Sequence, residues 1–205
     1  MVTRSVSFED FVSKYHALRH QRRLFAFLLC DDRPSHRDIR KFADANSGWL
    51  DQLARSAKIF FFIFGHKAKA RERGKNPSLK VASLFGIRPN QLPGIVLFTV
   101  VDERDGAVNR ALYLPLHPSL FGIKDSITEE VFADLFAGIQ RCLQNTSTEE
   151  DLWPALESVI EEVRSKGKWH VTIQHLQFLA TLPVKFLESM VAALGEGAAK
   201  RLTGG

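Results

Sequence analysis

The sequence has little cysteine and no long apolar run. Its 205 residues include two cysteines, Cys30 and Cys142, which are too few for a disulfide framework. The longest apolar stretches span 24–30, 59–64 and 95–101, far short of the roughly 20 residues that cross a membrane. A Cys-x-x-C pair, a P-loop, a Gly-x-Gly-x-x-Gly run and a Gly-x-Ser-x-Gly elbow are also missing. These absences exclude a disulfide-stapled scaffold and leave no signature of dithiol, nucleotide or serine-hydrolase chemistry.

The first ten residues contain no apolar stretch of signal-peptide length. With so few cysteines, this favours a reducing compartment, and we expect a cytoplasmic protein that does not associate with membranes. Sixteen phenylalanines and a hydrophobic fraction of 45% supply a substantial core. A formal charge of +5 permits contact with an acidic partner without requiring one.

Apolar spacing, capping signals and turn residues predict an alternation of helices and strands. Asn46-Ser47-Gly48 is expected to interrupt the second helix, and Asp105-Gly106 predicts a hairpin turn. The expected helices cover 7–23, 35–56, 76–86, 126–143, 152–164 and 169–194, and the expected strands cover 24–30, 58–64, 95–101 and 108–116. Ser126 and Ser147 each open a capping box.

Strands separated by helices favour parallel pairing with right-handed crossovers, and the hairpin adds an antiparallel edge. We therefore expect an α/β fold, a three-layer α/β/α sandwich around a mixed four-stranded sheet. The main domain is expected over 1–145, including the N-terminal helix. The remainder, 146–205, is expected to form a C-terminal helical extension with a flexible tail.

One local pattern is more specific. Val81-Ala82-Ser83-Leu84-Phe85-Gly86-Ile87 precedes Leu92-Pro93-Gly94, which opens an apolar strand ending at Phe98. Together with the element order over about 24–143, this pattern resembles the thioredoxin-like fold, in which a cis-proline precedes a core strand. The resemblance implies a cis bond before Pro93, which the residues themselves leave open.

In the thioredoxin-like fold the redox motif would lie a few residues beyond the first strand. The residues there are Arg33-Pro34-Ser35-His36, which contain no sulfur. We therefore expect a redox-inactive thioredoxin-like protein that binds or assembles with a protein or peptide partner and uses no cofactor.

The resemblance implies a partner surface made by Arg33, Ser35, His36, Leu92 and Pro93, with the backbone of Leu92 pairing with an extended peptide. The apolar stripe over 176–194 either closes the core or meets another protein or a second copy of the chain.

A competing hypothesis is a glutathione-dependent transferase or peroxidase-like enzyme with Ser35 or Cys30 in the active role. A hydroxyl at a helix start can activate the glutathione thiolate, as in some transferases related to this fold. The simpler interpretation makes Ser35 an N-cap and His36 a solvent-facing residue, with both cysteines as buried thiols.

A third hypothesis is a nucleic-acid-associated subunit. The densest basic stretch, 66–75, suits phosphate contact but lacks the interleaved aromatic residues that stack on bases. Its cationic residues are Lys67, Lys69, Arg71, Arg73 and Lys75. No metal site is expected, because His16 and His20 are spaced as ligands on one helix face but have no further ligand to complete a set.

Overall fold

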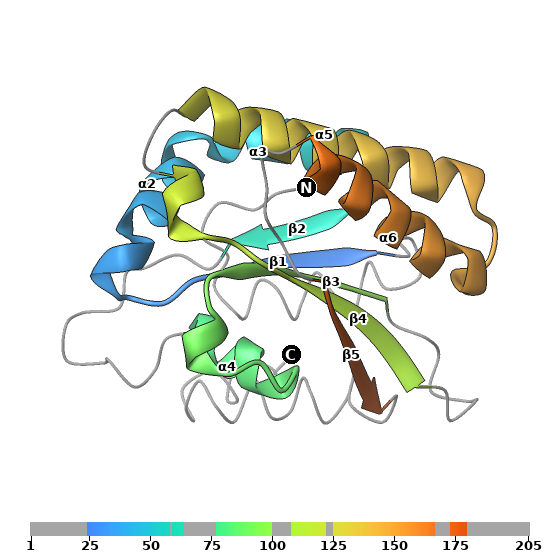
Figure 1. Ribbon diagram of the computed structural model, residues 1–205, viewed down its shortest axis with the longest axis horizontal. Helices are drawn as coiled ribbons and strands as arrows, with labels where there is room; N and C mark the ends of the chain where they lie inside the picture. Colours follow the sequence, from blue (N-terminus) through green and yellow to red (C-terminus); the bar gives the residue numbers. More distant parts are fainter. Residues whose placement is uncertain are drawn as a thin grey trace, which may run out of the picture.

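The computed structural model describes residues 24–57, 59–63, 77–99, 108–121, 125–166 and 173–179 (Figure 1). The strands are β1 (Phe25–Leu29), β2 (Phe60–Ile63), β3 (Gly94–Phe98), β4 (Val108–Pro115) and β5 (Gln174–Leu179). The α-helices are α2 (Arg37–Ala45), α3 (Ser47–Ser56), α4 (Pro77–Leu84), α5 (Asp125–Asn145) and α6 (Glu149–Ser165). Short 3-10 turns cover Pro34–His36, Pro89–Gln91 and Pro118–Phe121. The chain is therefore a mixed α/β protein.

The strands form one five-stranded sheet in the order β2-β1-β3-β4-β5. β1 pairs with β2 in parallel, whereas β3 is antiparallel to both β1 and β4, and β5 is antiparallel to β4. Every residue of β1 and β3 is buried, as suits central strands covered on both faces. The four expected strands and the hairpin pairing of β3 with β4 are confirmed.

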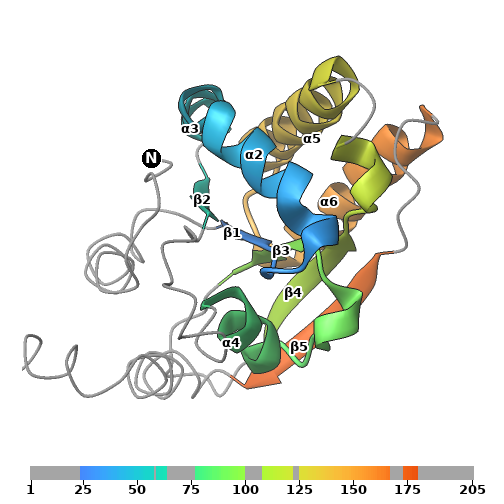
Figure 2. The same cartoon turned by 90° about the vertical axis from the view of Figure 1, so that its left-hand side faces the viewer.

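Helices cover both faces of this sheet. Figures 1 and 2 show α2, α3, α5 and α6 on one face and α4 on the other. The larger core lies on the first face, where apolar residues of α5 and α6 meet alternate residues of β1 and β4. On the α4 face, the rings of Phe25 and Phe98 stack with centroids 5.3 Å apart, and Phe85 packs against Phe98 at the same distance.

The helix ends match their local signals with small shifts. The expected interruption after α2 is confirmed, because Asn46 leaves helical geometry and its side-chain amide donates to the Phe42 carbonyl at 3.1 Å. α6 begins at Glu149, three residues before the expected start at 152, and Thr148 rather than Ser147 is its N-cap, accepting from the Asp151 amide at 3.2 Å. α5 begins at Asp125, so Ser126 lies inside its first turn.

The helix predicted over 169–194 is wrong where the structure describes it, because residues 174–179 form the edge strand β5. Leu176 and Leu179 have the spacing of a helical face, but six residues are too few for the helical period to decide the structure. The open edge of β4 offers backbone donors and acceptors, and pairing with it places Leu176 opposite Ala111. The expected four-stranded sheet therefore gains a fifth strand.

Several expected features lie outside the described residues: the helix over 7–23, the basic stretch over 66–75, the Asp105-Gly106 turn, and the C-terminal stripe and tail beyond residue 179. α6 and β5 both follow the expected boundary at residue 145, yet α6 packs into the larger core and β5 joins the sheet. Within the described ranges, no helix is both long and apolar enough to cross a membrane.

Candidate functional site

The loop after β1 folds around a buried carboxylate. Asp31 follows the last apolar residue of the strand and is 6% exposed. One carboxylate oxygen accepts from the backbone amide of Arg33 at 3.0 Å, a local turn that aspartate favours. Pro34 then opens a 3-10 turn that leads into α2. From α2, the Arg40 guanidinium donates to the Asp31 carbonyl, so the loop is held from both of its ends.

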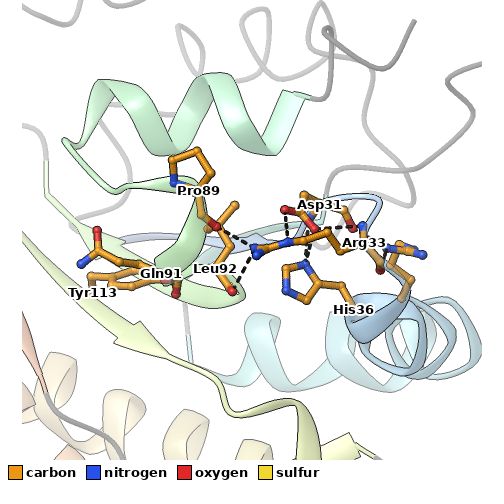
Figure 3. A network of polar contacts seen from close by, with 8 residues as sticks. Asp31, Arg33, His36, Pro89, Gln91, Leu92 and Tyr113 are labelled. Carbon is orange, nitrogen blue, oxygen red and sulfur yellow. Dashed lines mark hydrogen bonds and ion pairs between the residues drawn. The ribbon is translucent and has the colours of Figure 1, made fainter. Parts of the chain in front are cut away.

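The side chain of Arg33 bridges this loop to the turn before β3 (Figure 3). Its Nε lies 2.6 Å from Asp31 Oδ2, and its Nη2 donates to the Pro89 carbonyl at 2.6 Å and to the Leu92 carbonyl at 3.3 Å. The guanidinium therefore joins two loops nearly 60 residues apart in the chain, with separations of 56 and 59 residues. The group formed by Asp31, Arg33, His36, Pro89 and Leu92 is called the Arg33 bridge below.

His36 is the buried ring of the Arg33 bridge. The prediction that it faces solvent is wrong, because the residue is 1% exposed. Its ring lies beside the backbone of Leu92, and its Nδ1 lies 3.1 Å from the Asp31 amide nitrogen and 2.6 Å from Asp31 Oδ1. The neutral ring accepts from the amide at Nδ1, whereas the protonated ring donates to the carboxylate. Burial lowers the pKa of His36 below its ordinary value, and the Asp31 carboxylate opposes this effect without overcoming it.

The turn before β3 contains a cis peptide bond between Leu92 and Pro93, as the resemblance implied. The Leu92 amide donates to the Pro89 carbonyl at 3.3 Å, and the Pro93 carbonyl accepts from the Leu116 amide at 2.8 Å. With its own carbonyl accepting from Arg33, Leu92 has both backbone groups engaged inside the chain. An extended peptide that paired with Leu92 would first have to displace these contacts.

Tyr113 supports the same turn from β4. Its ring is fully buried, and its hydroxyl donates to the Gln91 carbonyl at 2.6 Å. Burial raises the pKa of Tyr113, so the phenol stays protonated and remains a donor. The ring lies so close to Gly94 that a Cβ there would overlap it. The Gln91 side chain in turn donates to Gln174 Oε1 on β5 at 2.9 Å.

The thiols and Ser35 take no part in the Arg33 bridge. Cys30 is buried, and burial raises the pKa of its thiol to about 12, so it stays protonated at neutral pH. Burial also raises the pKa of Cys142, on α5. Ser35 is exposed within the 3-10 turn, and His36 rather than Ser35 occupies the N-cap position of α2. The interpretation of Ser35 as an N-cap is therefore wrong.

The structure brings Arg33 and His36 next to Leu92, which precedes Pro93. A partner surface formed by the loop after β1 and the turn before β3 requires this contact. Their role in binding stays a prediction. Of the five residues that the resemblance assigned to the partner surface, Arg33 and Ser35 are exposed, whereas His36, Leu92 and Pro93 are buried. The cationic residues over 66–75 lie outside the described part of the chain.

Sequence reasoning missed the supporting residues Asp31, Arg40, Gln91 and Tyr113. The Asp31-x-Arg33 spacing, with proline next, is the signal that points to the local turn. Among the described residues, no group of three or more histidine, cysteine or acidic side chains is placed to hold a metal ion.

Comparison with known proteins adds no relative. A scan against family models and searches of the curated proteins and of the solved structures found no match to this chain. Inferences about function therefore rest on the topology and on the geometry of the Arg33 bridge.

Proposed function

We propose that this chain is a thioredoxin-like protein, built as a three-layer α/β/α sandwich, that binds a protein partner and performs no thiol chemistry. The strand order supports the fold: β2, β1, β3 and β4 are neighbours in that order, with β3 antiparallel to the strands on either side. The contact between the turn before β3 and the loop that follows β1 supports it further. The assignment rests on these features of topology alone.

The absence of sulfur at this junction supports the redox-inactive part of the proposal. A guanidinium stands where thiol chemistry would need a thiolate, and the nearby Cys30 is buried and protonated at neutral pH. Thiol–disulfide exchange needs an accessible sulfur with appreciable thiolate character. We expect no acceleration of insulin reduction by dithiothreitol when the protein is added.

The observation that carries the binding proposal is the state of Arg33. A guanidinium has five N–H donors. The bridge uses the Nε donor for Asp31 and the two Nη2 donors for Pro89 and Leu92, and 43% of the side chain is still exposed. Within the described part of the chain, its two Nη1 donors have no acceptor, and they can meet a carboxylate or carbonyl oxygen of a partner. Because the contacts within the chain already fix the side chain, binding costs little further rotamer entropy.

Within this proposal, Arg33 and Ser35 touch the partner, and the buried residues His36, Leu92 and Pro93 position them. The test is quantitative co-purification from the source cells with the wild-type protein and the Arg33→Ala variant. We expect the amount of a specific partner to fall at least about tenfold, as for removal of an anchoring arginine. Arg37→Ala is the matched control, since Arg37 is an exposed arginine at the start of α2.

Circular dichroism would first establish that both variants are folded. If the same proteins copurify in the same amounts with the wild type and with Arg33→Ala, the binding role of the Arg33 bridge is wrong. A loss of partner with Arg37→Ala equal to that with Arg33→Ala would instead point to non-specific charge attraction and would also contradict the proposal.

The exposed hydroxyl of Ser35 beside α2 is the one observation that favours the glutathione-dependent alternative. That alternative predicts heat of binding when glutathione is titrated into the protein, and loss of that heat in Ser35→Ala. Cys30 is a poor nucleophile for the same reaction because its thiol is protonated at neutral pH. The nucleic-acid hypothesis depends on residues 66–75 and stays a prediction, whose mark is salt-dependent binding.

A further inference from the structure

A second feature of the chain lies away from the Arg33 bridge, between α6 and the β4–β5 edge of the sheet. A pocket of about 220 Å³ opens there. Its apolar lining includes Trp153 of α6 and Leu112 of β4, both buried, together with Leu176 of β5. Its polar lining consists of Arg110, Glu157 and His175. An apolar pocket with a few converging polar groups is the usual form of a small-molecule site.

The strand register and the helical period explain why these residues meet. His175 pairs directly with Leu112, so the two side chains share one face of the sheet. Arg110 is two residues from Leu112 on the same strand and therefore points to that face as well. Trp153 and Glu157 are separated by four residues and lie on one side of α6. The pocket is thus where the edge of the sheet extends beyond the helix that covers it.

Arg110 and Glu157 carry opposite charges in this pocket and do not form an ion pair with each other. Among the residues that the structure describes, Arg110 has no ion-pair partner, although Glu157 lines the same small volume. Within the described residues, Glu157 is close to His175, whose Nδ1 lies 3.7 Å from Glu157 Oε1, beyond hydrogen-bond distance. Two opposite charges that line one pocket without forming an ion pair with each other suit a ligand that carries both of the complementary charges.

The volume limits the size of that ligand. Drug-sized molecules need pockets of roughly 300–1,000 Å³. The volume here, about 220 Å³, is below that range and suits a ligand of about the size of a free amino acid. We propose that the pocket binds a small zwitterion of the class of free α-amino acids with an apolar side chain. Its carboxylate meets Arg110, its ammonium meets Glu157, and its side chain rests on Trp153 and Leu112.

The test is isothermal titration calorimetry of the full chain with free L-leucine, L-valine, L-methionine and L-phenylalanine. We expect at least one to bind, and Arg110→Gln and Glu157→Gln each to weaken it by about tenfold to a hundredfold, as for loss of a charge-assisted hydrogen bond. The matched controls are Arg37→Gln and Glu150→Gln, which remove the same charges at exposed positions outside the pocket and should leave the affinity unchanged.

Ligand analogues test the same two contacts from the other side. N-acetyl-L-leucine lacks the ammonium charge and should lose the contribution of Glu157, whereas L-leucine amide lacks the carboxylate and should lose that of Arg110. The proposal is overturned if none of the four amino acids binds with a Kd below about 10 mM, a free energy too small for a built site. It is also overturned if both analogues bind as tightly as leucine, or if both pocket variants bind as tightly as the wild type.

Discussion

Arg33 and Arg110 are both exposed arginines next to the sheet, and the chain treats them in opposite ways. Arg33 donates to a buried carboxylate and two backbone carbonyls, so its position is fixed before any partner arrives. Arg110 lines a pocket and has no ion-pair partner in the described part of the chain. The same side chain is thus a structural cross-link in one place and an available charge in the other. Neighbouring acceptors, rather than residue type, decide which role an arginine takes.

Asp31→Ala should break this comparison most strongly, because the carboxylate is the acceptor that distinguishes Arg33. The change leaves the Arg33 side chain, the Arg33 amide and His36 without their shared partner. We expect the free energy of unfolding to fall by about 3 kcal/mol, measured by urea denaturation. The adjacent Asp32→Ala is the control, since Asp32 is exposed, and should cost about 0.5 kcal/mol. Equal losses in the two variants would show that the Asp31 contacts do not stabilise the fold.

The turn that receives Arg33 depends on close packing behind it. Gly94→Ala would force a methyl group into the ring of Tyr113, and we expect a loss of about 2 kcal/mol. The control is Gly48→Ala in α3, which is expected to have the opposite effect. A Cβ at this position has no atom within 4 Å, so the change should stabilise the helix by about 1 kcal/mol. Thermal unfolding of both variants measures the difference. A neutral Gly94→Ala would mean that the Tyr113 ring moves away freely.

The stability of the Arg33 bridge is expected to depend on pH through His36. Because burial lowers the pKa of His36 in the folded state, the unfolded state binds more protons just below the ordinary value of 6.5. The contribution of neutral His36 is therefore complete above that pH and is lost as pH falls toward the lowered pKa. The slope is at most about 1.4 kcal/mol per pH unit.

Urea denaturation between about pH 7 and pH 5 tests this expectation, against a reference pKa near 6.5. The His36→Gln variant should show a shallower pH dependence than the wild type. If the wild type and His36→Gln have the same slope, the burial of His36 does not govern its protonation.

Truncation of Arg33 and of Arg110 to alanine is expected to give the smallest difference in the free energy of unfolding. Arg33→Ala should cost about 1 kcal/mol, because the side chain is partly exposed and its contacts compete with water. Arg110→Ala should change the free energy of unfolding by less than about 0.5 kcal/mol, as for a surface residue that has no ion-pair partner among the described residues. Urea denaturation of the two variants side by side measures this. A larger loss for Arg110→Ala than for Arg33→Ala would reverse the comparison.

The strand β1, the hairpin of β3 with β4 and the helix break at Asn46 could be predicted because the sequence patterns that indicate them are local. The strand β1 is an unbroken apolar run, and the hairpin of β3 with β4 follows from apolar stretches on either side of Asp105-Gly106. The break at Asn46 was visible for the same reason. By contrast, β5 depends on an edge supplied by a distant strand, so the helical spacing of Leu176 and Leu179 misled the prediction.

The Arg33 bridge was predictable only in part. The resemblance placed the loop of Arg33 opposite Leu92 and Pro93, and the structure brings them into contact. Nothing in the sequence near His36 says that its ring is buried, because its burial depends on packing between the loop after β1 and the turn before β3. A histidine with polar neighbours in the chain resembles a surface residue until tertiary contacts are known.

The hydrogen bond between Gln91 and Gln174 connects the turn before Pro93 to β5. The next residues of β5, His175 and Leu176, line the pocket, while the Gln91 carbonyl holds the Tyr113 hydroxyl. This hydrogen bond thus connects the Arg33 bridge to the pocket. The changes in the free energy of unfolding caused by substitutions in these two regions are therefore not expected to add. By reciprocity, a ligand in the pocket that shifts β5 changes the affinity at Arg33 by the same factor that a partner at Arg33 changes the affinity of the pocket. A double-mutant cycle on Gln91 and Gln174 measures the strength of this single connection.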